Sequence, residues 1–358
     1  MAAAPLSVIS IAHAGDISAH TSLRCYHRSR TRQHGFYPTQ VMTRFRLCSA
    51  ILRLVSAALL CQPAQAWAWG GEAHRIIALL ADRLLQTGDP PVQKQITEML
   101  AADKSNVWTT TDIAGEAIWA DALREKCQEG RAATSKWHYV KLDPDNPDLN
   151  KACFDRPVLQ TMMPASHGPQ DDCIVDKIGQ FSKELREPAT LATERLMALQ
   201  FLLNLVGDVH DPLLAIEHND EGGHCVAVLP PGSKTPVRLS VLWEDELVVE
   251  AEGANPAKAA EQIAAGLTAV DIRKWSGGTP EEWARETYEL AKSVVYAFPS
   301  KAEGKFSFPV RKGETDVCGP VSLYRLDPGY RSRAVAAVKE QLAKAGVRLA
   351  ALLRENLQ

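Results

Sequence analysis

The 358-residue chain is 46% hydrophobic and 23% charged, which is typical of a globular protein with a sizeable core and excludes fibrous and disordered classes. Residues 1–68 contain seven Arg and one acidic residue, so residues 69–358 alone carry a formal charge of −9, against −3 for the whole chain. This balance excludes nucleic-acid binding through a general basic surface. A phosphodiester ligand would need bound metal ions to supply local positive charge.

A signal-like segment follows Met42. Basic residues lead into a mostly apolar stretch over residues 47–61, and residues 66–68 (Ala-Trp-Ala) match a small-x-small cleavage site. The apolar stretch is too short to cross a bilayer. We therefore predict a cleaved signal peptide, a secreted or periplasmic protein and a mature form without a membrane span.

The region before Met42 shows no helical or strand periodicity. Either Met42 is the true start or this region is a presequence. The predicted organisation is a leader and signal peptide over residues 1–68 and one domain over residues 69–358.

The domain is predicted to be all-α, a mainly helical single compact domain with a small β-hairpin excursion. Apolar residues at helical spacing over residues 190–211, ended by Pro212, predict a central buried helix. Residues 137–142 are predicted to be extended, and the hairpin excursion is expected over residues 222–249. The other predicted helices cover residues 72–85, 92–101, 112–127, 174–185, 256–267, 280–297 and 331–357.

Five cysteines remain after cleavage, and in an exported protein this odd number predicts two disulfides and one free thiol. Cys153 and Cys173 bracket a loop that contains Pro and Gly, and we predict that they pair. The alternative is that all five are reduced and buried. The sequence has no C-x-x-C pair, so a zinc site made of thiolates is not expected.

Candidate metal ligands recur along the domain. If cleavage follows Ala68, the amine and carbonyl of Trp69 and the imidazole of His74 can bind one metal ion. Further on, Asn204 and Asp208 are four residues apart and so share one helix face. Asp121 and His138 complete the series, and imidazole and carboxylate are ligands of zinc.

In its order, this succession resembles the zinc-dependent single-strand nucleases of the S1/P1 type, which are related to bacterial zinc phospholipase C. The resemblance covers essentially the whole domain. It rests on Trp69-Gly70 with His74, Trp119-Ala120-Asp121, His138-Tyr139, residues 201–208 (Phe-Leu-Leu-Asn-Leu-Val-Gly-Asp), Asp220-Glu221-Gly222-Gly223 and Leu242-Trp243-Glu244.

The resemblance implies a phospholipase C/nuclease-like helical fold with up to three zinc ions, which hydrolyses phosphodiesters to 5′-phosphates. One zinc site would comprise Asp121, His138, Asn204 and Asp208, and a second would comprise Trp69, His74 and the bridging Asp208. The metal pair would activate water for in-line attack on phosphorus. The implied catalytic residues are Asp121, Asp208 and Arg124; Arg124 would also contact phosphate, and Tyr139 would stack on a base.

The chain departs from the family pattern at Asn204 of the first zinc site and at three positions of the third zinc site. Asn204, Leu214 and Ser240 stand where the family has His, and Glu244 stands where it has Asp. Glu244 is then the remaining ligand of the third site, so two zinc ions are better supported than three. Lys141 stands where the family tends to have an acidic or amide side chain and could bind a phosphate. His210, His218 and His224 are candidates to replace a lost ligand.

The sequence thus predicts an exported zinc-dependent endonuclease that hydrolyses single-stranded DNA or RNA, with activity affected by the altered third site. One alternative is a degenerate relative that binds zinc without catalysis. The other is a phosphodiesterase that acts on a different phosphate ester, such as a phospholipid.

Overall fold

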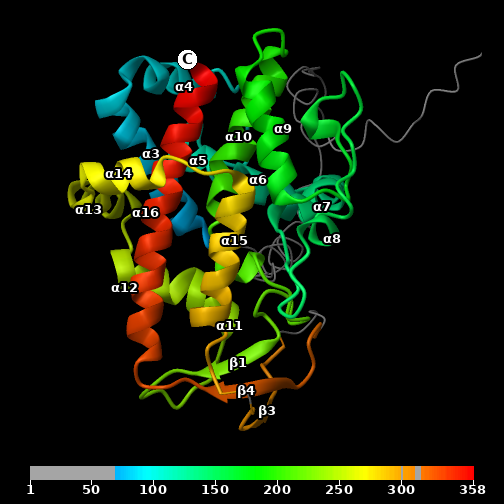
Figure 1. Cartoon of the computed structure of the whole chain (residues 1–358), viewed down its shortest axis with the longest axis vertical. Helices are drawn as coiled ribbons and strands as arrows, with labels where there is room; N and C mark the ends of the chain where they lie inside the picture. The colour runs from blue at the N-terminus through cyan, green and yellow to red at the C-terminus, as the bar shows by residue number, and fades with distance from the viewer. Residues whose placement is uncertain (1–68, 300, 311–315) are drawn as a thin grey trace, which may run out of the picture.

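The computed structural model describes residues 69–299, 301–310 and 316–358. The predicted leader and signal peptide lie outside these residues. Helices form most of the molecule, and a four-stranded sheet lies at one end (Figure 1). The mainly helical fold class with a small β excursion is therefore confirmed. Among the described helices, none is both long and apolar enough to cross a membrane.

The helices are α3 (Gly71–Gly88), α4 (Pro90–Ala101), α5 (Ile113–Glu116), α6 (Trp119–Lys126), α7 (Gln128–Thr134), η2 (Ser135–His138), α8 (Leu149–Ala152), η3 (Ala165–His167), α9 (Ile174–Arg186), α10 (Ala192–Asp208), η4 (Pro212–Leu214), α11 (Leu239–Val241), η5 (Leu242–Glu246), α12 (Leu247–Glu252), α13 (Pro256–Gly266), α14 (Ala269–Trp275), α15 (Pro280–Leu290), η6 (Ala291–Val295) and α16 (Tyr330–Leu357).

The predicted central helix is α10. Every residue from Met197 to Asp208 is buried, because apolar side chains occur on all faces of the helix and α9, α16, α6 and α3 pack around it. The polar side chains of residues 197–208 therefore lie inside the core. These are Gln200, Asn204 and Asp208.

Helix α3 carries the first candidate ligand and packs against α16 and α13. The predicted apolar face of α3, including Ile76, Ile77 and Leu80, is buried. A Cβ at Gly346 of α16 would overlap the side chain of Leu80, so the glycine permits the close approach of the two helices. This packing fixes the position of His74 at the start of α3.

The helix predicted over residues 112–127 is interrupted. The side chain of Asp112 caps α5 by accepting hydrogen bonds from the backbone N–H of Ala114 and Gly115. At Ile118 the backbone leaves the helical conformation, with φ −107° and ψ 7°, before α6 begins. The prediction of one continuous helix was wrong, and the break frees the carbonyl of Ala117 for another partner.

The sheet has the strand order β2-β1-β4-β3. The predicted hairpin is present as β1 (Val226–Leu229) and β2 (Val237–Arg238), which pair antiparallel. Two short strands, β3 (Gly304–Phe306) and β4 (Val321–Arg325), were not predicted, and β4 pairs parallel with β1.

Residues 239–249, expected within the excursion, are helical as α11, η5 and the start of α12. The buried apolar side chains of this segment are Leu239, Leu242, Leu247 and Val248. They recur at helical spacing and not at every second residue, as they would in a strand with one buried face. The excursion is therefore smaller than predicted.

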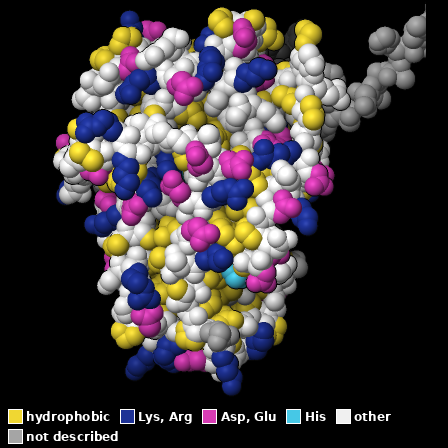
Figure 2. Space-filling view, in the orientation of Figure 1, with side chains coloured by type: hydrophobic (Ala, Val, Ile, Leu, Met, Phe, Trp, Pro, Cys, Tyr) yellow, Lys and Arg dark blue, Asp and Glu magenta, His cyan; other side chains and the backbone are white. Residues whose placement is uncertain are grey.

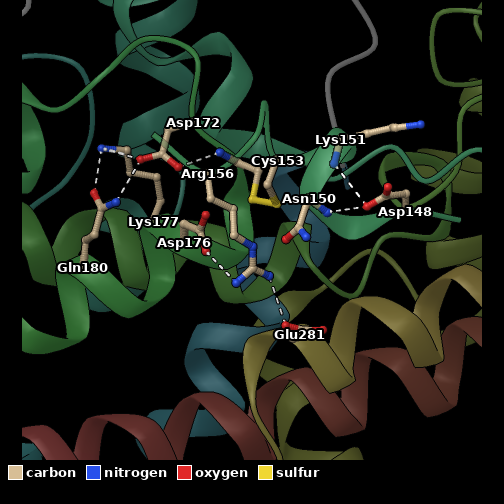
Figure 3. Close-up of a disulfide and its surroundings, with 11 residues drawn as sticks. Asp148, Asn150, Lys151, Cys153, Arg156, Asp172, Asp176, Lys177, Gln180 and Glu281 are labelled. Atoms are coloured by element: carbon tan, nitrogen blue, oxygen red, sulfur yellow. Dashed lines mark hydrogen bonds and ion pairs between the residues drawn. A yellow bond between two sulfur atoms is a disulfide. The ribbon is translucent and has the colours of Figure 1, made fainter. Parts of the chain in front are cut away.

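The predicted disulfide between Cys153 and Cys173 is present, and Cys225 bonds with Cys318. Cys127 is disulfide-bonded as well, so it is not the free thiol that the odd count predicted. Beside the first disulfide, Lys177 points toward Asp172 and Gln180 (Figure 3).

Candidate metal centre

His74 of α3 and Asp208 of α10 meet in the core. His74 Nε2 lies 3.2 Å from Asp208 Oδ1 and 3.8 Å from Asp121 Oδ2. Both His74 and Asp208 are fully buried. Helices that are distant in sequence thus bring three of the predicted ligands together.

His138 contacts the other oxygen of the same carboxylate, with Nδ1 2.7 Å from Asp208 Oδ2. Although burial alone would raise the pKa of Asp208, its contacts with His138 and His74 lower the pKa below the usual range for Asp. Asp208 is therefore an anion between two imidazoles.

An aromatic cluster in the core fixes these ligands. The ring of Phe201 lies 5.6 Å from the ring centroid of Trp119, 5.6 Å from that of Trp137 and 4.6 Å from that of Phe181. Asp121 follows Trp119 by two residues, and His138 follows Trp137 directly. Packing of large apolar side chains thus holds two candidate ligands beside α10.

Asn204 lies at the centre but acts as a hydrogen-bond donor. Its Nδ2 donates to Asp121 Oδ2 at 2.9 Å and to the carbonyl of Ala117 at 3.0 Å. Arg124 donates to the other oxygen of the Asp121 carboxylate. Asp121 is therefore held from both sides, and its side chain is 16% exposed, whereas Asp208 is closed off from solvent.

Trp69 lies at the same centre and is 1% exposed. Its backbone N–H donates to the carboxylate of Asp211, and the N–H of Gly70 donates to the carbonyl of Glu244 at 3.3 Å. A Cβ at residue 70 would lie 2.9 Å from that carbonyl, so only glycine allows this approach. The predicted residues Trp69 and Glu244 are thus brought to the other ligands.

The sequence prediction missed Asp211. It is buried beside Asp208, and burial raises its pKa to about 7, against hydrogen bonds from the backbone N–H groups of Leu213 and Trp69. Burial likewise raises the pKa of Glu244, and the nearby carboxylates of Asp211 and Asp245 raise it further. The only signal in the sequence was the position of Asp211 three residues after Asp208.

The donor set fits a bound cation. Several buried atoms of the candidate ligands have no hydrogen-bond partner, namely His74 Nε2, His138 Nε2, Asn204 Oδ1, Asp208 Oδ1 and Asp211 Oδ2. The carboxylates of Asp211, Asp245, Asp208 and Asp121 each raise the pKa of Glu244, and the carboxylate of Asp208 also raises the pKa of Asp211. Buried charge of one sign requires compensation. Imidazole and carboxylate together are typical zinc ligands.

These ligand atoms are more widely spaced than in a closed metal cage. Within the described ranges, three His, Cys, Asp or Glu ligand atoms lie mutually within 4.8 Å only at Cys153, Cys173 and Asp176, where the two sulfurs form the disulfide.

Leu214 and Ser240 occupy two sequence positions at which ligands of a third site were expected. Leu214 offers no ligand atom, and the hydroxyl of the buried Ser240 has no hydrogen-bond partner. His210 cannot serve as a replacement, because Nδ1 contacts the carbonyl of Val206 at 2.7 Å and Nε2 contacts Arg348 Nη1 at 2.9 Å. His218 is exposed and stacks on Tyr296.

The predicted substrate-binding residues Tyr139 and Lys141 are half-buried next to the centre. Lys141 Nζ lies 5.2 Å from the centroid of the Tyr139 ring and 3.9 Å from Glu217 Oε2. Burial raises the pKa of Tyr139, so its hydroxyl stays neutral.

Comparisons with known proteins identify the family. The S1/P1 Nuclease family model matches residues 69–358. Endonuclease 1 of Arabidopsis thaliana is 24% identical over 332 residues, which cover 86% of this chain and 93% of the relative. Nuclease S1 of Aspergillus oryzae is 24% identical over 315 residues, 84% of this chain and 95% of the relative. The chain therefore belongs to the S1/P1 nuclease family and is a hydrolase that acts on phosphodiester bonds.

Proposed function

We propose that this protein is an exported, zinc-dependent endonuclease that cleaves single-stranded DNA or RNA and leaves 5′-phosphates. The observation that carries the proposal is the contact of Asp208 with both His74 and His138, which brings a carboxylate and two imidazoles together in one buried centre. The disulfides and the signal-like segment of the sequence support export.

Two zinc ions are proposed, with Trp69, His74 and Asp208 at one and Asp121, His138 and Asp208 at the other. Asn204 would ligate through Oδ1, which has no other partner, while its Nδ2 holds Asp121. Bound zinc would lower the pKa of water and neutralise phosphate charge. We propose that the third site is eroded, because Leu214 and Ser240 leave Glu244 as its main ligand.

The protein's own groups then have distinct roles. Asp121 is the carboxylate with partial solvent access, so it is placed to accept the proton of the attacking water. Arg124 orients Asp121 and offers its guanidinium to a phosphate oxygen. Tyr139 provides a ring for base stacking, and Lys141 beside it can pair with a neighbouring phosphate.

The test is hydrolysis of single-stranded DNA by protein processed to Trp69, with a chelator and after zinc is restored. Zinc-dependent cleavage that is lost in Asp208→Asn supports the proposal. Asp82→Asn on the same helix as His74 is the control and should retain activity. Cleavage that is unaffected by the chelator would overturn it.

The second candidate is a relative that binds zinc but does not catalyse. It is favoured by the amide of Asn204, which donates to Asp121 and Ala117 where the family has an imidazole ligand. Zinc bound in a stoichiometric amount without turnover would support this alternative. Zinc content should also be compared between protein that begins at Trp69 and protein with one extra residue; equal zinc in both would show that the Trp69 amine is not a ligand.

A further inference from the structure

The sheet end of the molecule is basic although the domain as a whole is acidic. Figure 2 shows Lys and Arg side chains gathered around this end. The described residues of 226–238 and 301–325 carry Lys234, Arg238, Lys301, Lys305 and Arg325 against Glu303 and Asp316. A local excess of positive charge on a protein of opposite overall sign indicates an anionic partner at this end.

Partly exposed aromatic rings lead to the same end. His218 stacks on Tyr296 at 4.0 Å between centroids, Tyr296 lies 5.8 Å from Phe298, and Phe298 lies 4.5 Å from Tyr324 of β4. We name these four residues the aromatic track. The hydroxyl of Tyr296 donates to the buried Asp220 at 2.8 Å, which holds the middle of the track in place.

A basic side chain shares one face of the sheet with the track. Lys305 of β3 is opposite Ser322 of β4, and Lys305 Nζ donates to Ser322 Oγ at 3.2 Å. Ser322 and Tyr324 are two residues apart on one strand, so their side chains point to the same face. The ammonium of Lys305 therefore lies on the face that presents Tyr324.

The segment that leads into the track runs beside the segment that follows His138. The segment that follows His138 runs beside residues 214–217, with a bridge between Leu142 and Ile216. Lys141 is near both the Tyr139 ring and Glu217. Glu217 is followed directly by His218, the first residue of the track.

We propose that the aromatic track, with Lys305, binds the substrate strand beyond the cleavage position, by stacking unpaired bases on its rings and pairing a phosphate with Lys305. This inference rests on the proposed function for the nature of the strand. Because paired bases are already stacked on their neighbours, the track selects single strands over duplex.

Binding of a fluorescein-labelled 20-nucleotide oligothymidine to chelator-treated protein tests the proposal without turnover. We expect His218→Ala and Phe298→Ala each to weaken binding roughly tenfold, since a stacked base contributes about 1–3 kcal/mol. Lys305→Ala should reduce the slope of log affinity against log salt by about 0.7, the value for one phosphate of a single strand. Lys258→Ala, an exposed lysine on α13, is the matched control and should leave both quantities unchanged.

His218 is exposed, so its replacement does not open the core, whereas Phe298 packs against the core and its variant must be checked by thermal unfolding. Unchanged affinity in His218→Ala and an unchanged salt slope in Lys305→Ala would overturn the proposal. Equal affinity for the oligothymidine and for a duplex of the same length would do so too.

The experiments distinguish failure of the track proposal from failure of the proposed catalytic function. If the protein binds the strand through the track but does not cleave it, the track stands and the catalytic proposal fails. If the protein cleaves the strand and all track variants bind and cleave as the wild type does, the catalytic proposal stands and the track fails.

Discussion

The imidazole of His74 packs directly against Gly207: a Cβ at residue 207 would lie 2.6 Å from His74 Nδ1 and 2.8 Å from its Cε1. Gly207 immediately precedes Asp208 on α10, so the absence of a side chain there allows α3 to bring His74 to the carboxylate. A single glycine thus sets the separation of two candidate ligands.

Gly207→Ala should therefore displace His74 and weaken zinc binding. Overpacking at such a site costs about 1–3 kcal/mol in the free energy of unfolding. Gly179→Ala on α9 is the matched control, because a Cβ there meets no atom within 4 Å and the change should stabilise the protein by about 0.5–1 kcal/mol. Urea unfolding and calorimetric zinc titration measure both effects, and normal zinc affinity in Gly207→Ala would contradict the argument.

The disulfide between Cys153 and Cys173 should affect the metal centre as well as stability. It closes a loop of 20 residues in which the carbonyl of Pro169 accepts a hydrogen bond of 2.8 Å from Trp137, the neighbour of His138. Replacing both cysteines by Ala should cost about 3 kcal/mol in the free energy of unfolding and lower zinc affinity.

The second disulfide is the control for that effect. Cys225 and Cys318 are 93 residues apart, so replacing both by Ala should cost about 4.5 kcal/mol in the chain-entropy model. That pair ties the sheet together and does not hold Trp137. Equal loss of zinc affinity in the two double variants would show that the Cys153–Cys173 loop has no specific role at the centre.

Much of the centre could be predicted because its residues occur in a particular order on strongly periodic helices. The central helix and the candidate ligands His74, Asp121, His138 and Asp208 follow from that order, and the structure places these residues together. The role of Asn204 could not be predicted, because its amide donates to a carbonyl that becomes free only where the helix breaks.

The remaining differences also arise from tertiary structure. Asp211 reaches the N–H of Trp69 only because of the turn after α10. Strands β3 and β4 are short and partly exposed, so their side chains show little alternation between apolar and polar residues. In both cases the determining contact joins segments that are distant in sequence.

Stability should depend on pH through Glu184. Burial raises the pKa of its side chain from 4.5 to about 7, although Oε1 accepts a hydrogen bond of 2.6 Å from the N–H of Ala165. As pH rises from about 4.5 to about 7, the unfolded chain releases this proton while the folded protein retains it, so stability is lost over that interval. Glu184→Gln stays neutral and keeps an acceptor for Ala165. The variant should gain stability relative to the wild type between pH 5 and pH 7.5 in urea unfolding, and parallel pH profiles would contradict this.

Arg348 on α16 should stabilise the turn that carries the metal ligands. Its Nη1 donates to His210 Nε2 at 2.9 Å and its Nη2 donates to Glu286 at 2.7 Å. Burial, together with the charge of Arg348, lowers the pKa of His210 to about 3, so the imidazole is neutral and accepts this hydrogen bond. His210 is two residues after Asp208, which links the C-terminal helix to the centre.

Arg348→Met should leave His210 Nε2 buried without a partner, reduce the free energy of unfolding by roughly 2–3 kcal/mol and weaken zinc binding. Arg354→Met on the same helix removes only a surface ion pair with Asp89 at 3.8 Å, so it should cost less than about 1 kcal/mol and leave zinc binding intact. Urea unfolding and zinc titration of the two variants provide the comparison. If both variants lose the same small amount of stability and bind zinc as the wild type does, the hydrogen bond from Arg348 to His210 does not support the metal centre.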